Sequence, residues 1–398
     1  MSTTESSPAP ARLASLDAYR GFVMLLMLAE VLRLRAVANA FPDSAFWKFL
    51  AFHQSHVEWI GCSLHDLIQP SFSFLVGVAL PFSIANRAAK GQSPGRMWLH
   101  ALGRALALVL LGVFLRSTGR PMIYWTFEDT LSQIGLGYGA LFLLGFRPVR
   151  DQWIALGVVL VGYWAAFALW SAPADFEFAK AGVKETWLAD HRLTGLAAHW
   201  NKNSNLAWAF DTGWLNIFPR EKPFEFNNGG YATLSFIPTL GTMILGLLAG
   251  GVLRGKRAPM AKVKWFVIAG MASLATGWLV GALGICPVVK RIWTPSWVLF
   301  SGGLCCLFLA SFYAVVDVWQ RKAWAFPLVV IGTNSIAAYC MDHLFGGFIK
   351  AMLKTVCGQN AFKFLGASYE PVVHGAATLL VFWLLLFWLY RRKIFLRI

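Results

Sequence analysis

The chain has 398 residues, of which 57% are hydrophobic and only 14% are charged. Soluble domains carry about a quarter charged residues, so this chain lacks the polar surface that a soluble domain, a disordered chain or a coiled coil requires. The net charge of +16 would suit nucleic acid, but cationic residues of membrane proteins collect in cytoplasmic loops. The composition therefore predicts an all-α, polytopic integral membrane helix bundle with no nucleic-acid partner.

About ten apolar segments close to the length of a membrane span follow one another along the chain. A polar tail over residues 1–15, expected in the cytoplasm, precedes them and lacks the pattern of a cleaved signal peptide. The predicted spans are Leu16–Leu34, Leu64–Asn86, Met97–Leu115, Phe127–Gly145, Gln152–Trp170, Tyr231–Leu253, Trp265–Ile285, Ser296–Val316, Phe326–Phe345 and Gly375–Leu396. Residues 16–398 are thus expected to form one transmembrane domain, with a large extracytoplasmic loop at about 171–230.

Lys and Arg residues orient the predicted spans. With the N-terminus inside, the segments that would face the cytoplasm, such as 254–264 and 391–393, carry more Lys and Arg than the short loops that would face outward. We therefore expect both termini in the cytoplasm, as an even number of spans requires. The sequence has no strong internal repeat and no matched pair of broken helices, which weakens a transporter interpretation of the inverted-repeat kind.

The sharpest polar cluster lies at the outer mouth of the second predicted span. His56, Glu58, His65 and Asp66 fall within eleven residues. An imidazole titrates near neutral pH and can take and return a proton, and a carboxylate can fix its tautomer by accepting the other ring N–H. Zinc would use the same residue types, but the spacing fits no zinc motif. We therefore expect proton transfer here and no metal.

Ionisable residues in the first predicted span have both a functional and a structural interpretation. Asp17 and Arg20 lie three residues apart, so they can form a pair that anchors the helix or takes part in chemistry. Glu30 lies further along the same span, where Arg33 is the nearest partner in sequence.

Three later stretches have two interpretations as well. Asn334 and His343 in the ninth span would either line a site or hydrogen-bond between helices. Arg104, four residues from His100, would contact an anionic cofactor or, on the safer interpretation, lipid headgroups. The basic segment 290–296 would either line the outer mouth or anchor the helix by snorkelling.

The large predicted outer loop is rich in Trp, His and Asn. Stacking aromatic rings and amide side chains suit carbohydrate, which offers flat C–H faces and hydroxyl groups. An aromatic belt at the membrane interface is the structural alternative.

Several stretches resemble motifs of the heparan-α-glucosaminide N-acetyltransferase family. Residues 12–21 read RLASLDAYRG, where the family opens with RLxSLDxFRG. The segment 56–70 is similar to its H-x-x-W-x-G…D-L-x-x-P signature. Residues 293–297 (WTPSW), 334–335 (NS) and 389–395 (LYRRKIF) resemble later motifs. Because the motifs keep their order, the resemblance covers nearly the whole membrane part.

The resemblance implies a multi-span acetyltransferase that carries acetyl from cytosolic acetyl-CoA to an amino sugar on the far side of the membrane. His56 takes the place of the family's active-site histidine. The chain resembles bacterial-type members, so a bacterial inner membrane is the expected location. A homodimer is a possible assembly that the sequence does not decide.

Three departures from the family pattern affect this expectation. Glu30-Val31 stands where the family often has Asn, and Ser132-Gln133 stands where it usually has Gln-Arg. Residues 227–230 read NNGG in place of Asp-Pro-Glu-Gly, which removes two carboxylates from the outer face. Without these two carboxylates the outer face has fewer groups to bind a cationic acceptor, so glucosamine is less expected as the acceptor.

The leading hypothesis is an acyl-CoA-dependent N- or O-acetyltransferase. His56 would act as general base, or as an acetyl-histidine relay, with Asp66 or Glu58 orienting its ring. Asn334 or His343 would donate a hydrogen bond to the developing oxyanion. The predicted phosphate contacts are cations assigned to the cytoplasmic side, namely Arg20, Arg87, Lys90, Arg96 and Lys256. The predicted acceptor-binding residues lie on the outer side, namely Trp59, Trp293, Ser296, Asn227 and Asn228.

Two alternatives remain beside this hypothesis. One is a proton-coupled transporter or flippase for a sugar or lipid-linked substrate, with His56 and Asp66 as a proton relay. The other is a non-catalytic relative that binds acyl-CoA.

Overall fold

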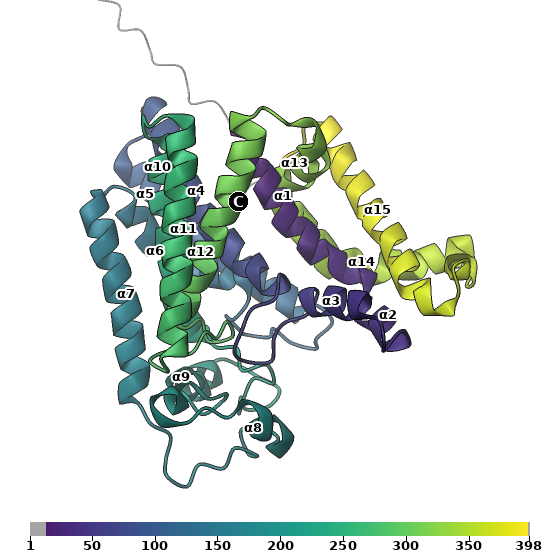
Figure 1. Cartoon of the computed structure of the whole chain (residues 1–398), viewed down its shortest axis with the longest axis horizontal. Coiled ribbons are helices and arrows are strands. Elements are labelled where there is room, and N and C mark those ends of the chain that lie inside the picture. Colours follow the sequence, from purple (N-terminus) through teal and green to yellow (C-terminus); the bar gives the residue numbers. More distant parts are fainter. Residues whose placement is uncertain (1–12, 397–398) are drawn as a thin grey trace, which may run out of the picture.

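The computed structural model describes residues 13–396. Residues 1–12 of the predicted tail, including Arg12 of the opening motif, lie outside the described residues. The regular elements within the described part are helical, which confirms the predicted all-α class. Most of the long helices lie together in one bundle (Figure 1). The long helices, with the short α13 that precedes α14, are α1 (Ala14–Leu28), α4 (Ile68–Ala89), α5 (Pro94–Ser117), α6 (Thr130–Leu144), α7 (Val149–Leu169), α10 (Phe236–Arg254), α11 (Pro259–Ala282), α12 (Pro295–Phe312), α13 (Phe326–Thr333), α14 (Ser335–Cys357) and α15 (Glu370–Arg391).

Each predicted span overlaps one of these helices or the broken pair α13 and α14, but the number of spans differs from the prediction. Seven described helical segments are long and apolar enough to cross a membrane, or eight if α13 and α14 form one span. These two helices are bent by 67° at Asn334. Helices α1 and α6 have 15 residues each, which gives about 22 Å of helix against a hydrocarbon core of about 30 Å. The count of about ten is therefore not confirmed.

Glycine residues let two pairs of long helices touch through their backbones. A Cβ atom built on Gly332 of α13 would lie 1.9 Å from the carbonyl oxygen of Asp17 in α1. Likewise, a Cβ atom on Gly77 of α4 would lie 2.0 Å from the carbonyl oxygen of Met243 in α10. Small residues at such crossings allow close van der Waals packing where lipid supplies no hydrophobic driving force. These contacts fix the positions of α1 and α4, and the segments next to these two helices carry residues of the candidate site described below.

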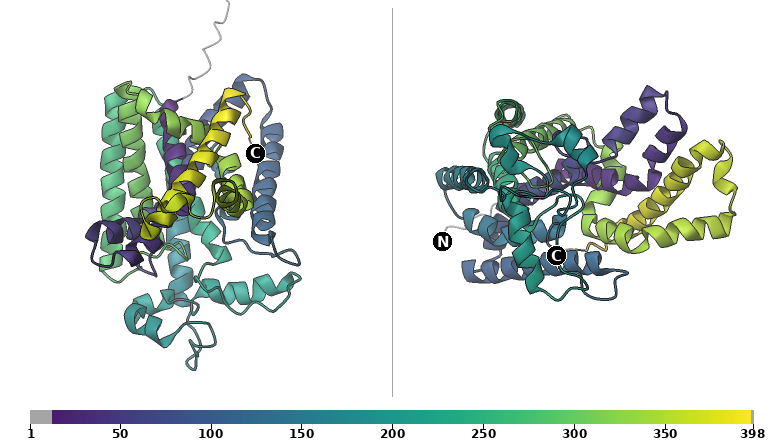
Figure 2. Two further views of the ribbon diagram at one scale, coloured as in Figure 1. Left: turned by 90° about the vertical axis from the view of Figure 1, so that its right-hand side faces the viewer. Right: turned by 90° about the horizontal axis from the view of Figure 1, so that it is seen from below.

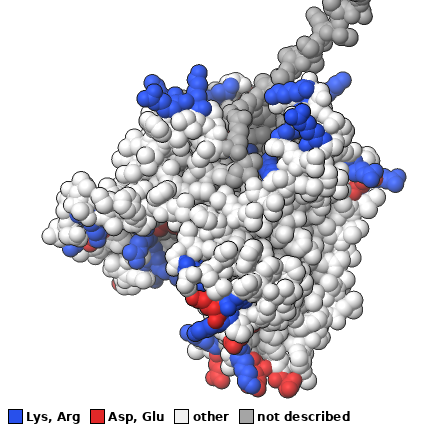
Figure 3. Space-filling view, turned by 180° about the vertical axis from the view of Figure 1, so that it is seen from behind, with Lys and Arg blue, Asp and Glu red and all other residues white. Residues whose placement is uncertain are grey.

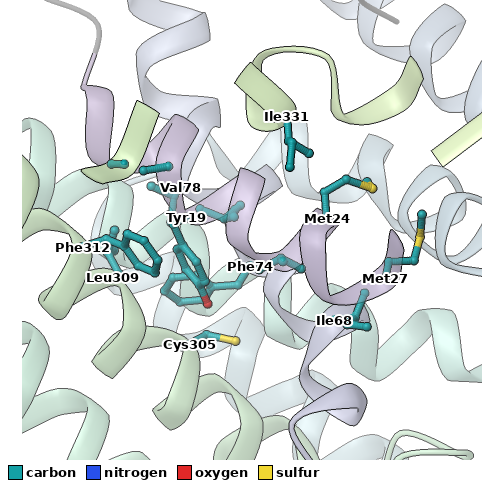
Figure 4. Close-up of a cluster of buried hydrophobic side chains, with 14 of the residues drawn as sticks. Tyr19, Met24, Met27, Ile68, Phe74, Val78, Cys305, Leu309, Phe312 and Ile331 are labelled. Carbon is teal, nitrogen blue, oxygen red and sulfur yellow. The ribbon is translucent and has the colours of Figure 1, made fainter. Parts of the chain in front are cut away.

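The largest buried cluster joins α1, α4, α12 and α13 (Figure 4). At its centre the hydroxyl group of Tyr19 lies 3.0 Å from Oγ of Ser71, and the ring of Tyr19 stacks on Phe312 at 5.3 Å between centroids. Phe74 packs in the same cluster and is fully buried. A tightly packed interior of this kind holds the helices in a single arrangement.

Shorter helices gather at one end of the bundle. Residues 171–230, here named the outer cap, contain α8 (Glu185–His191), η3 (Gly195–Trp200) and α9 (Leu206–Trp214), and lie at the bottom of Figure 1. The hairpin of α2 (Leu34–Ala40) and α3 (Ala45–His53) and the hairpin of α14 and α15 project from the bundle on one side, as the view from below shows (Figure 2). On the face drawn in Figure 3, Lys and Arg lie at the end opposite the outer cap without acidic neighbours, whereas acidic and basic side chains lie together at the cap end.

Candidate active site

His56 lies on the connection between α3 and the short helix η2 (His65–Leu67), at the cap end of the bundle. Contacts within the connection tie its two ends together. The hydroxyl group of Ser63 donates to the carbonyl oxygen of Ser55 at 2.6 Å, and the backbone N–H of Leu64 donates to Nδ1 of His53 at 3.1 Å. The loop that carries His56 is therefore closed on itself.

A second set of contacts attaches this loop to other parts of the chain. Ile60 pairs with Val289 in an isolated antiparallel bridge, next to Gly61, whose φ of 120° favours glycine. Arg291 donates one hydrogen bond to the carbonyl oxygen of Val57 at 3.1 Å and another to that of Gly229 at 2.8 Å. The connection between α11 and α12 therefore holds both the His56 loop and the loop that precedes α10.

Asp66 is buried beside His56 and meets hydrogen-bond donors at both oxygens. Its Oδ1 lies 2.8 Å from Nδ1 of His56 and 3.4 Å from Nζ of Lys290. Its Oδ2 accepts from the backbone N–H groups of Val57 and Ser63, at 3.2 and 3.0 Å, and lies 3.0 Å from Oγ of Ser63, whose one proton is shared between this oxygen and the carbonyl oxygen of Ser55. These contacts fix the position of the carboxylate.

The hydrogen bond to Asp66 determines which nitrogen of His56 can react. When Nδ1 donates its proton to Asp66, Nε2 carries the lone pair, and this atom has no hydrogen-bond partner among the described residues. The side chain keeps 37% of its surface exposed. Desolvation lowers the pKa of His56 below its usual value, and the Lys290 cation lowers this pKa further, while Asp66 opposes both effects. His56 therefore has the geometry and the neutral form that a general base requires.

A second imidazole lies beside the first. The ring of His65 is 4.5 Å from that of His56 between centroids, and its Nε2 lies 3.2 Å from Oε1 of Glu30. Glu30 belongs to the 3-10 turn η1 (Ala29–Leu32) that follows α1. The structure thus pairs Glu30 with His65 and not with Arg33, the partner nearest in sequence.

A cavity of about 630 Å³ opens between α1, α4, α5, α6 and α14. It reaches from the end of the bundle where α1 begins and α4 ends to the first residue of α6, near the cap end. Its polar lining consists of Asp17, Arg20, Ser83, Asn86, Arg104, Thr130, Tyr138, Thr333, Ser335 and Tyr339. Phe72 lines the cavity six residues after Asp66, so the two residues are separated by about 9 Å along the helix axis. One end of the cavity is therefore lined by the start of α4, and His56 lies on the loop just before this helix.

The cavity selects among the predicted phosphate contacts. Arg20 lines it, whereas Arg87, Lys90, Arg96 and Lys256 do not. Arg104, which the sequence assigned more readily to lipid headgroups, lines the cavity and lies 3.3 Å from the hydroxyl group of Tyr138. Burial and position, which the sequence does not give, separate these cations.

The other predicted catalytic residues form no hydrogen bond with His56 or Asp66 within the described part of the chain. Glu58 is exposed and forms no hydrogen bond or ion pair with a described residue. The side chain of Asn334 bonds the backbones of Ile394 and Leu396, at 2.9 and 3.0 Å, so it holds the segment after α15. Nδ1 of His343 contacts the carbonyl oxygen one turn earlier in α14, at 3.0 Å.

Most of the predicted acceptor-binding residues have structural contacts. Trp59 is buried and donates to the carbonyl oxygen of Trp200 at 3.1 Å. Trp293 and Ser296 are buried where α12 begins, and Ser296 donates to a carbonyl oxygen at 2.6 Å. The side chain of Asn227 closes a turn by accepting from two backbone N–H groups, whereas the neighbouring Asn228 is exposed.

The asparagines of the outer cap also have structural roles. Nδ2 of Asn201, Asn203 and Asn205 donates to backbone carbonyl oxygens at 2.8 to 3.0 Å. All three side chains are buried. Neither of the two interpretations made from the sequence, carbohydrate binding or an interfacial belt, accounts for these amides, which satisfy loop backbone inside a folded cap.

Comparison with known proteins adds to this geometry. No family model matches the chain. The chain is 24% identical over 439 aligned residues to the heparan-alpha-glucosaminide N-acetyltransferase of Homo sapiens, covering 100% of this chain and 61% of the relative. It is 20% identical over 429 residues to the protein of the same name from Mus musculus, covering 97% and 60%. The chain resembles these acetyltransferases along its whole length. This finding confirms the resemblance predicted from the motifs, although the chain spans only about three fifths of the length of these curated relatives.

Proposed function

We propose that this chain is an integral membrane acetyltransferase that moves acetyl from acetyl-CoA to an amino or hydroxyl group of an extracytoplasmic sugar. The observation that carries the proposal is the arrangement of His56. Its Nδ1 is held by a buried carboxylate, its side chain is partly exposed, and a cavity lined by Arg20 and Arg104 extends from the opposite end of the bundle to Phe72, six residues after Asp66. Donor and acceptor would thus reach one imidazole from two sides of the membrane.

The distribution of charge supports the direction of transfer. Lys and Arg gather at the end opposite the outer cap on the face seen in Figure 3, which is the end expected in the cytoplasm. Under the proposal, both termini are cytoplasmic, the membrane is a bacterial inner membrane, and the outer cap and His56 lie outside. The nucleotide of acetyl-CoA would lie near Arg20 and Arg104, whose guanidinium groups suit phosphate.

The chemistry assigned to His56 is general base catalysis. Nε2 takes the proton of the acceptor N–H or O–H group while the acceptor atom bonds to the thioester carbonyl carbon. The C–S bond then breaks, and the imidazolium returns its proton to the departing sulfur to give CoA–SH. In the covalent variant, Nε2 itself attacks the carbonyl carbon and the C–S bond breaks, so that CoA leaves as the thiolate. The acceptor then attacks the acetyl carbon, the bond from that carbon to Nε2 breaks, and the proton that the acceptor loses balances the one that CoA takes up. Asp66 holds the same tautomer in both cases.

The test uses the full chain in proteoliposomes with radiolabelled acetyl-CoA and a panel of amino and neutral sugars. The proposal predicts release of free CoA together with label in the sugar. His56→Ala should lower this rate by about 10²-fold or more, which is the usual contribution of a general base. His191→Ala, which removes another imidazole at the same end of the molecule, is the matched control and should keep the wild-type rate.

Three outcomes would contradict the proposal. Sugar accumulation driven by a proton gradient without CoA release would indicate a transporter. Binding of acetyl-CoA without transfer to any acceptor would indicate a non-catalytic relative. A His56→Ala variant with the wild-type rate would remove His56 from the mechanism.

A further inference from the structure

The second imidazole–carboxylate pair, Glu30 and His65, has no role in the mechanism above. His65 is buried, and its Nε2 lies 3.2 Å from Oε1 of Glu30. The side chain of Glu30 keeps 52% of its surface exposed, so one end of the pair meets solvent. A carboxylate–imidazole contact this exposed contributes little to stability, which leaves its position beside the reactive ring to be explained.

The two histidines use opposite ring nitrogens to contact their carboxylates. His56 directs Nδ1 toward Asp66 and leaves Nε2 as the proton acceptor, whereas His65 directs Nε2 toward Glu30 and leaves Nδ1. Nδ1 of His65 has no hydrogen-bond partner within residues 13–396. The ring centroids are 4.5 Å apart. Two imidazole nitrogens that can each accept a proton therefore belong to neighbouring rings.

The position of the second pair is fixed. Gln54, two residues before His56, donates from Nε2 to the carbonyl oxygen of Ala29 and accepts at Oε1 from the N–H of Leu34 at 2.7 Å. This side chain spans the ends of the turn that carries Glu30. The turn is thus attached to the loop of the reactive histidine.

An amine acceptor creates a need that one base cannot meet. An amino sugar is an ammonium ion near neutral pH, so R–NH₃⁺ and CH₃CO–S–CoA give R–NH–CO–CH₃, CoA–SH and one H⁺. Two protons leave the nitrogen. One returns to sulfur through His56, and the other must be taken before the nitrogen can attack, because an ammonium ion has no lone pair.

We propose that Glu30 and His65 form a second acid–base pair that takes this first proton when the acceptor is an amine. The inference rests on the proposed function. Nδ1 of His65 accepts the proton from the ammonium group directly or through one water molecule, and the imidazolium is paired with the Glu30 carboxylate. The freed amine then attacks the thioester as His56 takes its second proton. His65 passes its proton to solvent after the product leaves.

The charged and titratable groups near the pair belong to several elements. They are His56, Asp66 and Lys290 at the candidate site, Arg33 after η1, and Asp342, His343 and Lys350 of α14. Asp342 lies close enough to Glu30 for the two carboxylates to interact electrostatically, so this region carries two acidic groups that would attract a cationic acceptor. They offer a cationic group an alternative to the two acidic residues absent from 227–230.

The test measures kcat/KM against pH with one amino sugar, for the wild-type chain and for Glu30→Gln and His65→Asn. At pH 6, where the acceptor is fully protonated, each variant should be slower than wild type by about 10-fold or more. The deficit should shrink as pH rises above the pKa of the acceptor amine, because the acceptor then arrives without its extra proton. Glu30→Asp should restore part of the rate at pH 6, and Glu177→Gln, an exposed carboxylate of the outer cap, should match wild type.

The outcomes separate this inference from the proposed function. An equal deficit at every pH would indicate a structural role and overturn the inference, as would no deficit at pH 6 or transfer to hydroxyl groups alone. Thermal unfolding of each variant shows whether a uniform loss reflects misfolding. A wild-type chain that releases no CoA with any acceptor would overturn the proposed function itself.

Discussion

Nζ of Lys290 lies 3.4 Å from Oδ1 of Asp66 and 3.1 Å from Nδ1 of His56. Lys290 is buried, and desolvation lowers its pKa while Asp66 opposes this shift. When the His56 ring donates to Asp66, the ammonium group and the ring are both donors, so they share the same carboxylate oxygen. Lys290 therefore acts on the candidate base as a nearby positive charge.

Replacing Lys290 by Met should change the pH dependence of transfer. The cation disfavours protonation of His56, so its removal raises the pKa of His56. Because the neutral ring is the base, activity is lost as pH falls through this pKa. The acid limb of kcat/KM should therefore move to higher pH. Lys290→Arg keeps the charge and should keep the limb near its wild-type position, and an unmoved limb in Lys290→Met would contradict this role.

Replacing Asp66 by Asn should disable the base without removing it. The amide no longer provides a charged acceptor for Nδ1–H, so the ring is free to carry its proton on Nε2, where it cannot accept one. We expect kcat/KM to fall by about 10²- to 10⁴-fold. Ser63→Ala keeps the carboxylate and removes one of its donors, so it should cost no more than about 10-fold. Similar losses in the two variants would show that loop geometry, and not the carboxylate, matters.

The sequence predicts His56 and Asp66 together because they are ten residues apart and share one loop. Lys290 is 234 residues from His56, and its basic segment was equally consistent with an anchor at the membrane surface. The pairing of Glu30 with His65 was missed for a similar reason, since Arg33 was the nearer partner in sequence. Distance along the chain, and not residue type, limited the prediction of the site.

The positions of the long helices were predictable from hydropathy, but the number of them that are long enough to span a membrane and the breaks within them were not. For Asn334, a polar residue within a predicted span, both a place at the active site and a hydrogen bond between helices were open. Its side-chain partners are the backbone groups of Ile394 and Leu396, which lie 60 residues away or more. Trp59 and Trp293 show the same limit, because an aromatic residue suits a binding surface and a buried core equally well.

Arg104 should contribute to donor binding more than the cations outside the cavity. Its guanidinium group lines the cavity and lies 4.9 Å from the ring centroid of Tyr138. A hydrogen bond to a charged group is worth about 1.5–3 kcal/mol, so Arg104→Ala should raise the Kd of CoA by about 10- to 100-fold. Arg96→Ala, on the same helix but outside the cavity, is the matched control. Calorimetric titration with CoA measures both, and equal effects would indicate a general electrostatic attraction.

Asp211 should make the stability of the outer cap depend on pH. It is buried in α9, and its Oδ2 accepts from the backbone N–H of Thr233, just before α10, at 2.9 Å. Burial raises the pKa of Asp211 to about 7, while its hydrogen bonds to Thr233 oppose the shift. The folded chain thus favours the protonated acid, which joins the cap to the bundle at the end that carries the candidate site.

Because the pKa is higher in the folded state, the stabilisation is complete below about pH 4 and is lost as pH rises toward about 7. The thermal unfolding midpoint in detergent should therefore fall across this interval. Asp211→Asn can still accept from Thr233 but carries no charge, so its thermal midpoint should depend less on pH. At pH 8 this midpoint should be higher than that of wild type, which corresponds to a difference in the free energy of unfolding on the order of 1–4 kcal/mol. Tryptophan fluorescence measures the transition, and four of the 19 Trp residues lie in the outer cap. A wild-type midpoint that stays constant or rises between pH 4 and pH 8 would contradict this assignment, as would a variant that follows the wild-type curve.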